Sequence, residues 1–172
     1  MSKNIELIVA RDIKYGIGLD GKIPWRCLED MQHFRRTTTT TKDPTKQNAV
    51  IMGRKTWNSL RKPLENRVNI CLSSSPQTIP TFATMEAAIA YANNDLMIET
   101  IFIIGGVQVY REALDTLDVD YIWVTVIKRE FPTDRDVRFM RKYLKNRYFT
   151  VIRYTDEYCI WKYERSKIQS II

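Results

Sequence analysis

Two segments of the sequence have the residue types of a phosphate-binding turn. Residues 49–52 form an apolar run that predicts a buried strand, and Gly53-Arg54-Lys55-Thr56 follows it directly. A second apolar run, residues 101–104, leads into Gly105-Gly106. Glycine allows a phosphate close to the backbone, a helix N-terminus offers free N–H groups, and arginine and lysine add positive charge. Each turn alone is a weak signal, and together they predict a site for a phosphorylated cofactor.

The sequence lacks the two standard nucleotide-binding signatures. Neither GxGxxG nor GxxxxGK[ST] is present, which argues against a standard Rossmann fingerprint and against a P-loop. A run of serines, residues 73–75, follows a third short apolar run, residues 69–72. Its hydroxyl groups are a further candidate contribution to the same site.

Asp30 is the best candidate for a functional acid. The pattern over residues 28–36 is helical, and at about 100° per residue four apolar side chains share one arc: Cys27, Leu28, Met31 and Phe34. Asp30 lies about 40° from Phe34, at the edge of this arc, so its carboxylate is expected to be partly removed from water. A fully solvated aspartate is the alternative. Five threonines, residues 37–41, are expected to end the helix in an exposed loop.

Arg67 and the residue types that can bind metals support weaker predictions of function. Arg67 could hold a substrate carboxylate through a bidentate contact, or it could be an ordinary surface residue. The chain has one histidine, His33, which disfavours a Ser-His-Asp triad and a multi-histidine metal site. Its three cysteines are far apart, so neither a disulfide framework nor a CxxC site is expected. No metal is expected.

Composition limits the class of protein. The 172 residues include 44% hydrophobic and 27% charged side chains, which suits one globular domain and excludes a disordered or collagen-like chain. Lys and Arg outnumber Asp and Glu by 27 to 20, and the pI of about 9.4 suggests an anionic partner. No stretch approaches the roughly 18 apolar residues of a membrane span, and the first residues lack a signal-peptide core. We expect a cytoplasmic protein.

The order of the predicted elements indicates an α/β fold. Apolar runs at residues 5–10, 49–52, 69–72 and 101–104 alternate with helical patterns at 28–36, 55–60, 85–92 and 107–114. Thr84 is expected to cap the third helix. After residue 120 the period changes to two, which predicts strands at 121–128, 148–154 and 158–164, the last two as an antiparallel hairpin. We therefore expect a single-domain, mixed, mostly parallel sheet flanked by helices.

Taken together, these blocks closely resemble dihydrofolate reductase in order and spacing. The similarity is carried by Ile17-Gly18 with Pro24-Trp25, by Asp30 with Phe34, by residues 50–57, and by residues 103–106 with Tyr110. Residues 1–166 are accordingly expected to form the reductase domain and residues 167–172 a tail. The resemblance implies an eight-stranded sheet. It also implies an enzyme that transfers hydride from NADPH to carbon 6 of 7,8-dihydrofolate, with protonation of nitrogen 5, to give tetrahydrofolate.

The resemblance also implies roles for residues of a substrate site. Asp30 would hold the pteridine ring and favour proton delivery, Thr125 would hydrogen-bond this acid, and Trp25 would position a water molecule. Arg67 would hold the α-carboxylate of the folate glutamate. The other substrate-site positions, most of them apolar walls, would be Ile8, Val9, Phe34, Leu60, Leu64, Ile104 and Tyr110.

On the cofactor side, the resemblance implies a set of contacts along the whole NADPH molecule. Near the nicotinamide would lie Ala10, Ile17 and Gly18, and under the pyrophosphate Gly105, Gly106 and Val107. Facing phosphates would be Arg54, Lys55 and Thr56, with Ser73 and Ser74 near the adenosine 2′-phosphate, and Gly53 and Leu72 complete the set. Two cations and two hydroxyls suit a phosphate that NADH lacks, which favours NADPH.

One segment departs from the family pattern. Where members usually have Asp-Thr-x-Phe-Pro, this chain has Asp136-Val137-Arg138-Phe139-Met140. In the family, this segment supports a mobile loop that corresponds to residues 16–25 here. Loop closure and product release are therefore expected to differ in this protein.

Two other functions fit part of the sequence. A pyrimidine reductase of riboflavin synthesis shares the fold, but Pro24-Trp25 and the Asp30/Phe34 pair argue against it. A nucleic-acid-binding protein would explain the net charge of +7 and the aromatic content, but the sequence has no RNP-like motif or recognition helix. The protein is expected to be a monomer, or the reductase part of a longer bifunctional chain with thymidylate synthase. The basic stretch at residues 138–147 has no assigned role.

Overall fold

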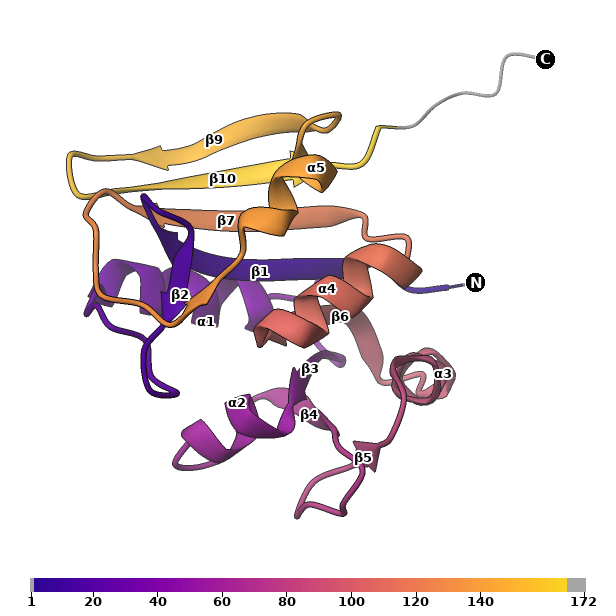
Figure 1. Ribbon diagram of the computed structural model, residues 1–172. Coiled ribbons are helices and arrows are strands. Elements are labelled where there is room, and N and C mark those ends of the chain that lie inside the picture. The colour runs from indigo at the N-terminus through magenta and orange to yellow at the C-terminus, as the bar shows by residue number, and fades with distance from the viewer. Residues whose placement is uncertain (1, 167–172) are drawn as a thin grey trace.

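Eight of the strands form the main sheet, in the order β5-β4-β3-β6-β1-β7-β10-β9 (Figure 1). The computed structural model describes residues 2–166, so the predicted tail, residues 167–172, lies outside the described residues. The parallel strands are β1 (Ile5–Asp12), β3 (Gln47–Gly53), β4 (Arg67–Leu72), β5 (Thr81–Phe82), β6 (Ile98–Gly105) and β7 (Tyr121–Ile127). The antiparallel strands are β9 (Tyr148–Tyr154) and β10 (Tyr158–Glu164). The predicted mixed, mostly parallel α/β sheet with its C-terminal hairpin is confirmed.

Helices cover both faces of this sheet. The larger apolar cluster joins one face to α3 (Met85–Asn94) and α4 (Val107–Thr116). The smaller cluster joins the other face to α1 (Leu28–Thr39) and α2 (Arg54–Ser59). In Figure 1, α4 lies in front of the sheet and α1 lies behind it. No helix within residues 2–166 is long and apolar enough to cross a membrane.

Several short elements were not expected from the sequence. Strands β2 (Gly16–Gly18) and β8 (Arg135–Asp136) pair as a separate two-stranded sheet. A 3₁₀ turn at Arg138–Met140 runs into α5 (Arg141–Leu144), so the basic stretch is partly helical. Elements of two to four residues carry too little periodicity to be recognised in a sequence.

The end of α1 corrects the expectation for the threonine run. The helix continues through Thr39, and Thr38 is fully buried, whereas an exposed loop was expected from residue 37 onward. The hydroxyls of Thr38 and Thr39 donate to the carbonyls of Phe34 and Arg35, each at 2.7 Å. Such bonds to the carbonyl four residues earlier satisfy the hydroxyl groups inside a helix. The poor helix propensity of threonine is overridden here because Thr38 is also buried in the folded protein.

The buried side of α1 also differs from the expected apolar arc. Leu28 and Met31 are 47% and 63% exposed, and the two buried residues of the helix are His33 and Thr38. Phe34 is half-buried and packs against the sheet as expected. The helix is therefore rotated from the phase that apolar spacing alone predicts, because polar groups with partners take part of the buried face. The expected cap of α3 is confirmed, since the Ala87 N–H donates to Thr84 Oγ1 at 3.2 Å.

Candidate active site

Most of the predicted cofactor residues and Thr125 lie at the carboxyl ends of the parallel strands, whereas Arg67 is the first residue of β4 and lies at its amino end. Parallel strands end on the same side, and the ends of β4, β3 and β6 are in register, with Leu72 opposite Gly53 and Met52 opposite Gly105. On the next pair of strands, Ala10 of β1 is opposite Thr125 of β7. In open α/β sheets, ligands bind in the crevice outside these carboxyl ends. The structure thus brings the predicted cofactor positions and Thr125 to the edge where such ligands bind.

The two glycine turns lie against each other at this edge. A Cβ atom placed on Gly53 would be 3.9 Å from the Gly105 carbonyl oxygen, and one on Gly106 would be 3.7 Å from Thr56 Oγ1. Gly105 has φ of 122°, and a Cβ there would lie 3.2 Å from the Tyr110 ring. A side chain at Gly105 would therefore be strained and crowded. The Gly105–Gly106 peptide bond is cis.

Polar side chains flank these turns. Arg54 and Lys55 are exposed at the start of α2, and Thr56 beside them is half-buried. At the end of β4, Ser73 is half-buried and Ser74 is exposed. Val107 begins α4, directly after Gly106. The edge therefore offers two cations, three hydroxyls and glycine backbone in one place, as expected for an anion-binding surface.

Asp30 lies in the first turn of α1 and is partly buried. Burial raises its pKa above the usual value for aspartate, and a hydrogen bond from the Thr125 side chain acts in the opposite direction. Thr125 itself is only 2% exposed. A carboxyl group held in this way, with a raised pKa and a fixed partner, is typical of acid–base sites.

Tyr110 ties the two central strands together beside this acid. Its hydroxyl lies 2.8 Å from the Ile8 carbonyl oxygen on β1 and 2.9 Å from the Ile104 carbonyl oxygen on β6. Burial raises the Tyr110 pKa, and the negative charge of Asp30 raises it further. Tyr110 is therefore a neutral hydrogen-bond donor that fixes the spacing of β1 and β6.

Most of the predicted apolar walls form one cluster next to Asp30. The buried members are Ile8, Val50, Met52 and Phe102, and the half-buried ones are Phe34, Trp57, Leu60, Leu64, Ile104 and Trp123. Val9 does not join them, because alternate residues of a strand face opposite sides and Val9 packs in the larger cluster. Its side chain is therefore on the other face of the sheet from Ile8.

Arg67 is buried rather than on the surface. Its exposed fraction is 9%, its Nε donates to the Glu65 carbonyl at 2.9 Å, and Nη1 donates to Thr38 Oγ1 at 3.0 Å. The Phe34 ring lies 5.9 Å from the guanidinium carbon. None of the salt bridges among residues 2–166 uses Arg67. The Arg67 guanidinium is therefore oriented by neutral groups beside the apolar cluster. Its positive charge is not paired with a carboxylate within residues 2–166, so it is available to bind an anionic ligand.

The loop after β1 is held by a carboxylate that the sequence did not single out. Asp12 is fully buried, and its Oδ1 accepts hydrogen bonds from the Lys14 and Gly16 N–H groups, both at 2.8 Å. Its Oδ2 accepts a third from the Phe131 N–H at 3.0 Å. Asp12 thus ties the start of the loop that carries Ile17 and Gly18 to the segment before β8. Asp12 follows the apolar run at residues 5–10 beside another charged residue, Arg11, so the sequence gave no signal for this role.

Trp25 lies at the other end of that loop. Its ring centroid is 5.6 Å from that of Phe131, and both rings pack against the cluster of Ile127, Tyr158 and Ile160. Gly16 and Gly18 pair with the β8 segment. The loop is therefore anchored at both ends to residues 131–136, which lie next to the segment, residues 136–140, that departs from the usual family pattern.

Glu6, Trp123 and His33 form a second cluster of polar side chains, between the sheet and α1. The Trp123 Nε1–H donates to Glu6 Oε2 at 2.7 Å, and the His33 ring centroid is 5.7 Å from that of Trp123. Burial raises the Glu6 pKa and lowers the His33 pKa to about 4, the latter with help from the charge of Arg36. His33 Nε2 is buried, and no partner for it is found among the described residues. His33 is therefore neutral at ordinary pH.

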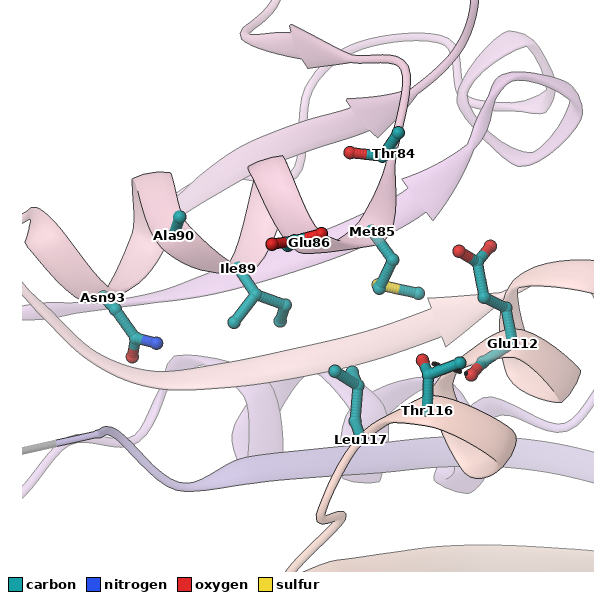
Figure 2. Close-up of a pocket in the computed structure, with 9 residues that line it drawn as sticks. All are labelled: Thr84, Met85, Glu86, Ile89, Ala90, Asn93, Glu112, Thr116 and Leu117. Atoms are coloured by element: carbon teal, nitrogen blue, oxygen red, sulfur yellow. Dashed lines mark hydrogen bonds between the residues drawn. The ribbon is translucent and has the colours of Figure 1, made fainter.

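A groove of about 550 Å³ between α3 and α4 is a separate feature (Figure 2). Figure 2 shows Met85 and Ile89 extending from α3 toward Leu117, with Glu112 projecting from α4. None of its lining residues belongs to the predicted site. The groove is therefore distinct from the strand edge described above.

Comparisons with known proteins agree with this geometry. The family model described as dihydrofolate reductase matches residues 4–157. The dihydrofolate reductase of Drosophila melanogaster is 38% identical over 137 residues, covering 74% of this chain and 75% of that protein. That of Heliothis virescens is 36% identical over 141 residues, covering 76% of each. The bifunctional dihydrofolate reductase-thymidylate synthase of Daucus carota is 37% identical over 145 residues, 77% of this chain but 28% of that longer protein.

These matches cover most of the chain, and Asp30, both glycine turns and Thr125 lie within the matched residues 4–157. The fold and the class of enzyme expected from the sequence, an oxidoreductase of this type, are confirmed. The chain belongs to the dihydrofolate reductase family.

Proposed function

We propose that the protein reduces 7,8-dihydrofolate to 5,6,7,8-tetrahydrofolate with NADPH, and so serves one-carbon metabolism and the synthesis of thymidylate and purines. One observation carries the proposal. The partly buried Asp30 carboxyl, bonded by Thr125 and with a raised pKa, opens beside an apolar cluster at the same strand edge as the two glycine turns. Membership of the family supports the same reading.

The residues at the glycine turns fit NADPH. Side chains are absent at Gly105 and Gly106, so a pyrophosphate has close access to the backbone, and a Cβ at Gly105 would instead meet the Tyr110 ring. Arg54 and Lys55 are exposed cations beside the Thr56 hydroxyl, which suits phosphate groups. Ser73 and Ser74 would add hydroxyls near the 2′-phosphate, and Ala10, Ile17 and Gly18 would border the nicotinamide. NADPH, when bound, supplies the hydride that reduces carbon 6.

The acid and its neighbours would hold the substrate's pteridine ring. An ionised Asp30 accepts two parallel hydrogen bonds from a planar amino and ring N–H edge. Burial raises the pKa of Asp30 and so favours the protonated form, which can supply a proton. Both states favour protonation at nitrogen 5. Thr125 would keep the carboxyl in one orientation. Trp25, on the loop, would hold a water molecule near it.

The other end of the substrate would lie along the apolar cluster. Phe34, Leu60 and Leu64 would contact the aminobenzoyl ring, since they are partly buried side chains at this cluster. Arg67 would bind the α-carboxylate of the glutamate, because its guanidinium is oriented by Thr38 and has no anionic partner in the described chain. An arginine fixed in advance loses less entropy when it binds.

A direct assay tests the proposed function. Purified protein is mixed with NADPH, and the absorbance of NADPH is followed before and after dihydrofolate is added, with folate as a second substrate. We expect oxidation of NADPH that depends on dihydrofolate, with tetrahydrofolate as the product. A folded protein that binds NADPH but shows no dihydrofolate-dependent oxidation would contradict the proposal.

A further inference from the structure

Asp12 is a buried carboxylate that accepts its hydrogen bonds from backbone N–H groups. It lies at the end of β1, is fully buried, and takes part in no salt bridge within residues 2–166. Its Oδ1 accepts from the Lys14 and Gly16 N–H groups, and its Oδ2 accepts from the Phe131 N–H. Burial of a carboxylate is unfavourable unless hydrogen bonds replace its water. The carboxylate therefore holds three backbone groups in fixed positions around it.

These hydrogen bonds join two segments that are far apart in the sequence. Through Oδ1, Asp12 fixes the turn at residues 14–16, which leads into β2. Through Oδ2, it fixes Phe131, which is 119 positions away in the chain. The segment after Phe131 leads to β8, which pairs with β2, and Figure 1 shows this orange segment beside β2. One side chain therefore sets the spacing between the loop and the segment that supports it.

The turn that Asp12 holds has a strained backbone. Tyr15 has φ of 70°, in the left-handed region that residues with a side chain seldom adopt. Its N–H donates to the Asp12 carbonyl at 3.1 Å, and its own carbonyl accepts from the Val137 N–H at 2.9 Å. The Arg11 guanidinium carbon lies 3.9 Å from the centre of the Tyr15 ring. Such a conformation persists only when its surroundings fix it, and here the carboxylate and these contacts do so together.

Gly16 leaves the loop no room to move toward its support. A Cβ atom placed on Gly16 would lie 2.5 Å from Thr133 Cγ2 and 2.8 Å from Thr133 Cβ, closer than real Cβ atoms come. The loop and the segment before β8 are therefore as close as a residue without a side chain permits. Because the Gly16 N–H is also bound to Asp12, this residue is fixed from two sides.

The residues expected to border the nicotinamide lie on both sides of this fixed turn. Ala10 is two positions before Asp12 on β1, and Ile17 and Gly18 follow Gly16 directly. The Gly18 carbonyl accepts from the Asp134 N–H at 2.9 Å, so it too depends on the supporting segment. A transfer between two carbons needs them about 3–3.5 Å apart and aligned. A small shift at Gly16 would reach Ile17 and Gly18 and disturb that alignment.

We infer that Asp12 is a positioning residue for hydride transfer, which rests on the proposed function. Its carboxylate acts through the backbone of Gly16, and so holds the segment of Ile17 and Gly18 against the nicotinamide. The chemical step itself uses no group of Asp12. Loss of the carboxylate should therefore slow the hydride step while the folded protein keeps its substrate site.

Two substitutions of Asp12 test this role. Hydride transfer is measured in a single turnover, with NADPH and with NADPH deuterated at the transferred position. Asp12→Ala should slow the transfer by about tenfold or more, because all three N–H groups lose their acceptor. Asp12→Asn keeps an oxygen for Gly16 but turns an amide toward the Phe131 N–H, so its rate should lie between those of the parent and Asp12→Ala.

The kinetic constants separate positioning from a general loss of structure. The deuterium isotope effect on kcat should rise in Asp12→Ala, because a slower hydride step limits turnover more. The KM for dihydrofolate should stay within about twofold of the parent value, since Asp30 and Arg67 lie on other elements. A loss of structure would not produce this separation of kcat from KM.

Asp120→Ala is the matched control. Asp120 Oδ2 accepts from the Ile5 N–H at 3.0 Å, so this carboxylate holds the opposite end of β1. The variant should lower the melting temperature but leave the hydride rate within about twofold of the parent value. Hydrogen exchange of residues 13–18, followed by mass spectrometry, should be about tenfold faster in Asp12→Ala and unchanged in Asp120→Ala.

Gly16→Ala tests the same position with Asp12 intact. The new methyl group would meet Thr133 and push the loop away from its support, so hydride transfer should again slow by about tenfold. Adding Thr133→Gly removes the atoms that the methyl group meets, and the double variant should recover to within about threefold of the parent rate. Circular dichroism verifies that each variant is folded.

The possible outcomes are distinct. An active parent whose hydride rate is unchanged in Asp12→Ala and in Gly16→Ala overturns the positioning role alone. Equal hydrogen exchange of residues 13–18 in the parent and in Asp12→Ala also overturns it, because the carboxylate would then not hold the loop. A parent protein that does not oxidise NADPH with dihydrofolate contradicts the proposed function itself, and the positioning role with it.

Discussion

Arg67 donates a hydrogen bond from Nη1 to Thr38 Oγ1 over 3.0 Å, and this contact joins the start of β4 to the last turn of α1. The same hydroxyl donates to the Phe34 carbonyl at 2.7 Å. Thr38 therefore accepts from the guanidinium and donates to the helix at once. The substrate role proposed for Arg67 depends on this neutral partner, because a carboxylate partner would compete with the substrate.

Thr38→Val keeps the shape of the side chain and removes this acceptor. We expect the KM for dihydrofolate to rise about fivefold with little change in kcat, since one hydrogen bond contributes about 1 kcal/mol. Steady-state kinetics at saturating NADPH measures this. Thr39→Val is the control, because Thr39 Oγ1 makes the same kind of bond, to the Arg35 carbonyl at 2.7 Å, but does not contact Arg67. An equal effect of both variants would show that Thr38 does not act on substrate binding through Arg67.

The threonine run also marks a limit of sequence reasoning. Helix propensity predicts that β-branched residues end a helix, and this rule holds when no partner is available. Here the partners are carbonyls one turn earlier and a guanidinium 29 positions away in the sequence. The second partner depends on tertiary structure and leaves no local pattern. The same reason explains why the buried carboxylate of Asp12 was missed.

The parts that could be predicted are those that depend on local pattern. The apolar runs that become β3, β4 and β6 are followed by glycine or serine, and these positions meet because parallel strands end at one edge. The phase of α1 could not be predicted in the same way. Leu28 and Met31 are exposed and His33 is buried, and this burial depends on which parts of the fold pack against each face of the helix. Val9 and Ile8 show the alternation of a strand, which assigns each to its own face once the sheet is known.

Arg54→Ala tests the cofactor assignment. If Arg54 faces a phosphate that NADH lacks, the KM for NADPH should rise about tenfold, because a charge-assisted contact is lost, while the KM for NADH changes little. Parallel kinetics with both cofactors measures the difference. Arg61→Ala, an exposed arginine outside the predicted set, should leave both constants unchanged. Equal increases for NADPH and NADH with Arg54→Ala would contradict the assignment.

His33 should make the stability of the protein depend on pH in the acid range. Its pKa is 6.5 in the unfolded chain and about 4 in the folded protein because of burial, so between these values the unfolded chain holds the extra proton. The free energy of unfolding therefore rises as pH rises from about 4 to 6.5, by about 3 kcal/mol for this shift. His33→Phe should remove this contribution to the slope.

Urea unfolding at several pH values measures it, with the difference between variant and parent as the readout. Thr37→Val is the control, because it removes the partner of His33 Nδ1 at 3.2 Å and leaves the histidine in place. It should retain the slope. Identical slopes for His33→Phe and the parent protein would show that His33 does not keep a lowered pKa in the folded state.

Asp30 should reduce the stability of the fold at neutral pH. Burial raises its folded pKa above the usual value of 3.8, so the folded state binds the proton more tightly than the unfolded chain does. Stability from this group is therefore present below pH 3.8 and is lost as pH rises through the folded pKa. Asp30→Asn should raise the melting temperature at pH 7, with no gain in acid. Glu29→Gln, an exposed neighbour, should change neither value.

The most direct test of the proposed role of Asp30 compares the parent protein with Asp30→Asn in the oxidation of NADPH by dihydrofolate at pH 7. Loss of a general acid–base group lowers turnover by about 10² to 10⁴, and we expect a decrease in this range. The dissociation constant for NADPH, measured by fluorescence, should stay within about twofold of the parent value because Asp30 lies outside the predicted cofactor contacts. Glu29→Gln should remain fully active. Near-normal turnover by Asp30→Asn would contradict the central claim that this carboxyl group drives the reaction.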